Sequence, residues 1–103
     1  MNNNLDNSIE PKIQMLEALE RLEKNKDFQK VIIDGYLKDE VLRANSLLAN
    51  PTIKTQGKRA DIMEILVAIS TFGEYLATIK ALGNTARYQK EHPNDFDEDG
   101  DKE

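Results

Sequence analysis

The residues best suited to chemistry lie near the end of the chain, where acidic side chains alternate with other residues. Asp95, Asp97 and Asp99, followed by Gly100, match the opening of an EF-hand calcium loop. Such a loop needs a bidentate glutamate at its twelfth position, whereas this stretch reaches only the ninth, Glu103, and has no exit helix. A solvated acidic tail has the same composition. We therefore predict no metal site here.

The other polar residues do not combine into a catalytic arrangement. His92 is the only imidazole in the chain and precedes Pro93, where we expect no second group to orient it as a general base. A helix-terminal histidine favoured by the helix dipole is the simpler interpretation. Ser46, Ser70 and Thr71 have neither a glycine-rich turn nor a base motif around them. We predict that the protein is not an enzyme and has no catalytic or cofactor-binding residues.

The net charge of −5 is concentrated at one end of the chain. Residues 94–103 contain six acidic side chains and one lysine, so the rest of the chain is balanced, with 13 acidic and 13 basic side chains. A surface that binds nucleic acid gathers lysine and arginine on one side. The neutral body therefore predicts no nucleic-acid partner.

The absence of cysteine and the short apolar runs exclude further kinds of site and partner. The 103 residues include no cysteine, which removes disulfides, thiol nucleophiles and most structural zinc sites. The longest uninterrupted apolar run, Ile65–Ile69, is far shorter than the roughly 20 residues of a spanning helix. We expect no membrane partner.

Helical periodicity, helix caps and helix breakers organise the chain into helices and turns. The predicted helices cover residues 8–24, with Ser8 as the N-cap, then 28–34, 37–49 and 58–82. The apolar phase changes after Gly35, which favours a bend there over a continuous helix in which the glycine admits a close neighbour. Residues 51–57 read as a polar loop, and Gly83-Asn84 as the C-cap of the long helix. The alternative is a frayed continuation over residues 85–91, because Ala86 extends the same seam, which His92-Pro93 must end. No stretch alternates with period two, so we expect no sheet.

The long helix has a heptad-like apolar seam. Its members are Ile62, Ile65, Ile69, Phe72, Leu76 and Ile79, at spacings of three and four residues. The flanking apolar positions make this face broad enough for the core of a bundle. We predict an all-α fold of three or four helices around the long one. The predicted organisation is a disordered N-terminus over residues 1–7, a single helical domain over 8–92 and a disordered acidic tail over 93–103.

Four residues are candidates for contact with another protein molecule. They are Tyr36, Phe72, Gly73 and Leu76. A glycine inside a helix costs about 0.5–1 kcal/mol, so Gly73 predicts close approach by another helix, in the same chain or in another copy. We therefore expect a homo-oligomer, most simply a dimer. The alternative is a core closed within one chain by the apolar residues of the earlier helices, Leu16, Leu19, Leu22, Val41 and Leu48.

Three stretches carry a resemblance to known proteins. Residues 19–28, 35–40 and 47–51, within a region of about 10–85, resemble a group of small helical proteins that tailed bacteriophages encode among virion and assembly genes. The resemblance implies a phage accessory role, no known active site, and location in the host cytoplasm and the virion. The function expected from it is a virion structural or assembly component acting through protein contacts. The alternative is a host-directed inhibitor that blocks a bacterial defence or replication enzyme.

Overall fold

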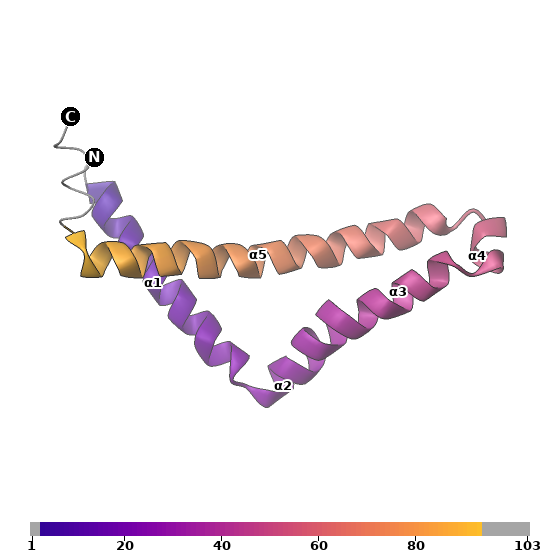
Figure 1. The fold of residues 1–103 in the computed structure, drawn as a ribbon, viewed down its shortest axis with the longest axis horizontal. Coiled ribbons are helices and arrows are strands. Elements are labelled where there is room, and N and C mark those ends of the chain that lie inside the picture. The colour runs from indigo at the N-terminus through magenta and orange to yellow at the C-terminus, as the bar shows by residue number, and fades with distance from the viewer. Residues whose placement is uncertain (1–2, 94–103) are drawn as a thin grey trace. The chain divides into compact units, whose positions relative to one another are not determined.

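The computed structural model describes residues 3–93, with side chains from Ser8 onward, and every element in this part is helical (Figure 1). The elements are α1 (Asn3–Glu23), α2 (Lys26–Phe28), the π-helix η1 (Gln29–Asp39), α3 (Glu40–Leu48), α4 (Pro51–Thr55) and α5 (Arg59–Glu91). The described residues contain no strand. The prediction of an all-α fold with one long helix is confirmed.

The chain divides into two compact units. The terminal unit comprises Met1–Arg21 and Leu76–Glu103, and the central unit comprises Leu22–Tyr75. Helix α5 contributes its second half to the terminal unit and its first half to the central unit. The single helical domain over residues 8–92 stays a prediction, because a compact unit of contacts is not by itself an independently folding domain. The tail over residues 94–103 lies outside the described residues.

Asparagine caps set two of the helix starts. The Oδ1 atom of Asn25 accepts a hydrogen bond from the backbone N–H of Phe28 at 2.9 Å, which begins α2 where the sequence predicted a break. Asn50 accepts from the backbone N–H of Thr52 at 2.8 Å, and Pro51 occupies the first turn of α4. The prediction that residues 51–57 form a polar loop is therefore wrong for Pro51–Thr55, which form α4. Gly57 follows α4 with a φ of 70°, which glycine adopts without a steric cost.

The start of α1 differs from the prediction. The helix begins at Asn3, five residues before the predicted N-cap at Ser8, and ends at Glu23. Pro11 lies inside it, where proline removes one backbone donor from the helical ladder.

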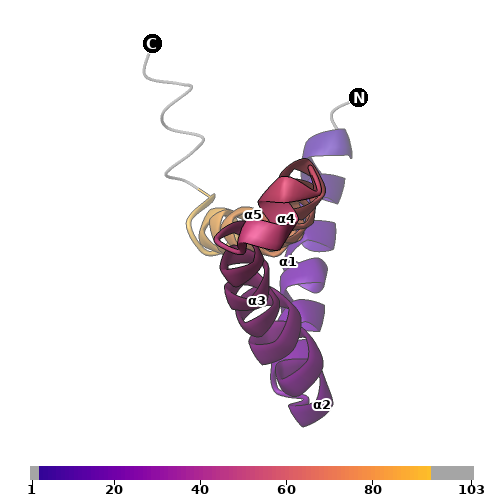
Figure 2. The ribbon, with the colours of Figure 1, turned by 90° about the vertical axis from the view of Figure 1, so that its right-hand side faces the viewer.

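The predicted bend at Gly35 is wrong. The run from α2 through η1 to α3 is helical without interruption (Figures 1 and 2), and the N–H of Glu40 bonds to the carbonyl of Gly35 five residues earlier. Wider π turns change the angle between successive residues, so they absorb the shift in apolar phase that suggested a bend. A Cβ at Gly35 would lie 3.0 Å from the carbonyl oxygen of Lys30, so its closest neighbour is its own helix.

The predicted C-cap at Gly83-Asn84 is also wrong, whereas the alternative, a continuation to Glu91 that ends before His92-Pro93, is confirmed. Helix α5 continues to Glu91, and the N–H of His92 bonds to the carbonyl of Tyr88 at 2.8 Å. Gly83 is buried inside the helix because Leu16 of α1 packs directly against it. The glycine permits a close helix crossing instead of ending the helix.

The apolar seam of α5 faces inward, as predicted. Ile62 and Ile69 are buried, and the other four seam residues are half-buried. In the central unit, Ile62 and Ile69 are buried together with Ala44. In the terminal unit the buried apolar side chains are Ile13, Leu16, Leu19 and Ala86.

Candidate protein contact surfaces

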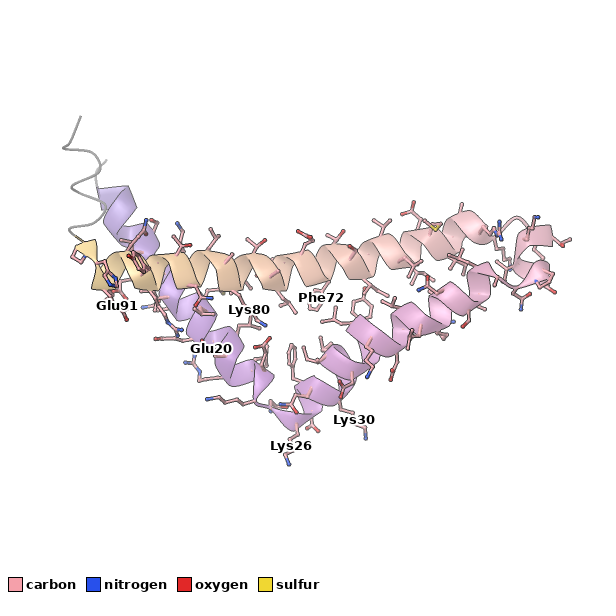
Figure 3. All side chains as sticks on the ribbon, viewed as in Figure 1. Glu20, Lys26, Lys30, Phe72, Lys80 and Glu91 are labelled. Atoms are coloured by element: carbon pink, nitrogen blue, oxygen red, sulfur yellow. The ribbon has the colours of Figure 1, made fainter. Side chains whose placement is uncertain are left out.

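Two of the predicted contact residues meet inside the central unit. Phe72 (Figure 3) and Tyr36 pack edge to face, with ring centroids 5.8 Å apart and planes at 69°. Both side chains are half-buried. This arrangement joins η1 to α5 by a favourable aromatic contact. A role of either ring in contact with another protein stays a prediction.

Gly73 has more space around it than the sequence suggested. A Cβ at this position would meet only Leu37 Cδ2, at 3.9 Å, which is an ordinary van der Waals distance. No helix described between residues 3 and 93 therefore needs Gly73 to be a glycine, so of the two alternatives the close approach within the chain is wrong and the approach of another copy stays a prediction. The fourth residue, Leu76, is half-buried and belongs to the terminal unit.

The larger exposed apolar side chains lie elsewhere, at positions that the sequence did not suggest for contact, and they include Leu22, which was expected in the core. On α5, Met63, Val67 and Tyr75 expose 48%, 54% and 53% of their surfaces. On α1, Met15 and Leu22 expose 48% and 46%. Both sets repeat at helical spacing, on sides of the helices away from the buried seam. These residues could have been found in the sequence, because they form a second apolar stripe with the same helical period.

Helix α5 is apolar around most of its circumference. It is long and apolar enough to cross a membrane by length and composition alone, with a mean hydropathy of 1.5 over 18 residues, of which 11% are buried. Its apolar part also includes three charged residues, Glu64, Glu74 and Lys80. Apolar helix surfaces are normally covered by protein or lipid, so the exposed apolar part of α5 is available for contact.

Two ion pairs join α1 to the end of α5 within the terminal unit. Arg87 donates from both terminal nitrogens to the carboxylate of Glu20, at 2.8 and 3.0 Å, and Lys90 lies 2.7 Å from Glu10. The hydrogen bonds that Arg87 and Lys90 donate to these carboxylates raise the pKa of both basic groups. The forked Arg87–Glu20 pair fixes the orientation of the two helices more than it stabilises them, because both partners are partly exposed to water.

The single imidazole has a local structural role. Its Nδ1 lies 3.1 Å from the carbonyl oxygen of Tyr88, and the rings of His92 and Tyr88 stack with centroids 4.1 Å apart. Both side chains are exposed. This geometry agrees with the predicted helix-terminal histidine.

A third ion pair makes one contribution to stability dependent on pH. Arg43 donates to both carboxylate oxygens of Glu40, with Nε 3.0 Å from Oε1, and this hydrogen bond lowers the pKa of Glu40. A carboxyl whose pKa is lower in the folded state stabilises the fold above its unfolded pKa, and this contribution is lost as the pH falls through the folded pKa.

We therefore expect Glu40→Gln to lower the melting temperature slightly at neutral pH and to leave it unchanged in acid below the lowered pKa. Thermal melts followed by circular dichroism at both pH values measure this. Asp34→Asn is the control, because the exposed Asp34 carboxylate has no ion pair with any side chain described between Ser8 and Pro93. Equal pH dependence in the two variants would show that the Glu40 pair does not form.

Neither metal ligands nor relatives point to an activity. No group of three or more histidine, aspartate or glutamate side chains that could hold a metal occurs in the described part of the chain, and the EF-hand-like stretch lies outside it. Comparisons with protein-family models, curated proteins and solved structures find no match to this chain.

Proposed function

We propose that this chain is a non-enzymatic bacteriophage accessory protein that acts through protein–protein contacts, as a virion structural or assembly component. The observation that carries the contact role is the surface of α5, which exposes Met63, Val67 and Tyr75 on the side opposite its buried seam. Assembly proteins work by covering such surfaces with other subunits.

The distribution of apolar side chains supports this proposal. Among the described residues seven apolar side chains are buried, whereas nine large apolar side chains remain exposed. Scattered single exposed side chains are ordinary in monomers, but here several repeat along one helix. Covering them with a partner removes apolar surface from water and stabilises the complex.

The phage and virion parts of the proposal rest on the resemblance carried by residues 19–28, 35–40 and 47–51. The protein is then made in the host cytoplasm and incorporated into the particle or used while the particle is built. Its partners are other virion proteins and copies of itself, with no nucleic acid and no membrane among them.

Mass spectrometry of purified virions tests the virion role. For a structural component we expect the chain in the mature virion, at a stoichiometric ratio to the major structural proteins. For an assembly component we expect it in assembly intermediates but not in the mature particle. Absence from both, with synthesis early in infection, would contradict the proposal and favour the host-directed inhibitor.

A further inference from the structure

Helix α1 has an exposed apolar stripe that is separate from its buried side. The stripe consists of Pro11, Met15, Ala18 and Leu22, at spacings of four, three and four residues, and all four are exposed. These spacings place the residues on one face, as in a coiled-coil seam. The stripe contains no charged residue. Lys12 and Arg21 lie at its two ends. We name this surface the α1 stripe.

Helix α5 has an exposed face of similar length. Met63, Val67, Thr71 and Tyr75 follow one another at intervals of four residues, and all are exposed. Glu64 and Glu74 lie beside the ends of this row and are also exposed. We name this surface the α5 face.

The charges at the ends of the two surfaces are opposite in sign and similarly spaced. Lys12 and Arg21 are nine residues apart, or about 14 Å along a helix, and Glu64 and Glu74 are ten residues apart, or about 15 Å. None of these four side chains forms an ion pair with any side chain described between Ser8 and Pro93. The α1 stripe and the α5 face therefore complement each other in both apolar content and charge.

We infer that the α1 stripe of one copy docks on the α5 face of a second copy. The occupant of each surface is thus this same chain, and the inference names one partner for the contact role proposed above, on which it rests. Apolar side chains fill the centre of the contact, and the Lys12 and Arg21 side chains reach the glutamates at its ends.

A single contact of this kind is smaller than a stable interface. One α1–α5 contact covers on the order of 600–700 Å² of total surface, because each large side chain has about half its area left to bury. Stable interfaces bury about 1,200 Å² or more. Two such contacts, each between the α1 stripe of one copy and the α5 face of the other, together bury this area, so we expect a stable dimer to form both.

Charge reversal in trans tests the inference on the purified full chain. Sedimentation equilibrium over a micromolar range should give a mass of twice 11.7 kDa for the wild type. The variant E64K/E74K places like charges at every contact, and so does the variant K12E/R21E. We expect each variant alone to associate at least about tenfold more weakly.

An equal mixture of the two variants should recover the dimer mass, because the basic α1 stripe of the first meets the acidic α5 face of the second, and the reverse pair also has opposite charges. The quadruple variant K12E/R21E/E64K/E74K should recover it as well. Far-ultraviolet circular dichroism of each variant controls for folding, and all four replaced side chains lie outside the buried core.

Three outcomes would overturn the inference. One is a wild-type protein that is monomeric at every concentration. If this monomer also floats with phosphatidylcholine vesicles, the result would assign α5 to a lipid surface. Another is undiminished association of K12E/R21E, which would mean that two α5 faces pair with each other. The third is a mixture of the folded variants that stays monomeric. Presence of the chain in virions is measured separately, so the proposed function can stand when this inference fails.

Discussion

Replacing Ile69 with alanine should lower the free energy of unfolding by about 2–5 kcal/mol, the range for removing a large buried aliphatic side chain. Ile69 lies at the middle of the α5 seam and exposes only 3% of its surface. The loss combines the transfer free energy of the deleted groups with the cavity they leave, since neighbouring helices relax only partly. Urea denaturation followed by circular dichroism gives the value.

Leu42→Ala is a matched control for this measurement. Leucine and isoleucine contain the same atoms, but Leu42 on α3 exposes 58% of its surface. Its replacement should change stability by no more than about 0.5 kcal/mol. Ile69→Asp should prevent folding, because an unpaired carboxylate would enter the core. Equal, small losses for Ile69→Ala and Leu42→Ala would mean that the seam is not the core of the central unit.

Replacing Gly83 with alanine should destabilise the terminal unit by about 1–3 kcal/mol, through overpacking. The new Cβ would lie 2.8 Å from Cδ2 of Leu16 and even closer to its Cβ, which is attached to the backbone of α1. Leu16 exposes only 2% of its surface, so its side chain has no free space into which to rotate. The crossing of α1 over α5 must therefore widen.

Replacing Gly73 with alanine should instead stabilise the protein. Both glycines lie inside α5, where alanine is favoured over glycine by about 1 kcal/mol, and a Cβ at Gly73 meets only ordinary contacts. Denaturation of both variants, at protein concentrations too low for self-association, measures the two changes in the free energy of unfolding. Stabilisation by both alanines would show that α1 does not cross α5 at Gly83. Strong destabilisation by Gly73→Ala would show a close partner at that position after all.

The candidate surfaces could be predicted only in part from the residues. The pattern of Ile62 through Ile79 correctly identified an inward-facing seam, because apolar spacing and helical period are properties of the sequence itself. The same pattern suggested Phe72 and Gly73 for outside contacts. In the structure Phe72 packs on Tyr36 of the same chain, and the exposed residues lie on the other side of α5. Which of two apolar faces is covered depends on the neighbouring helices, which the period cannot specify.

The sequence by itself determined the all-helical class and the helix breaks at Asn25 and Asn50, because these depend on groups within a few residues of one another. The asparagine side chains satisfy nearby N–H groups, and helical periodicity needs no distant partner. The role of Gly83, in contrast, depends on a distant part of the chain. A glycine can bend a helix, end it or admit a neighbour, and the local sequence allows all three. At Gly83 the choice is made by Leu16, 67 residues away along the chain, whose side chain occupies the space where a Cβ would stand.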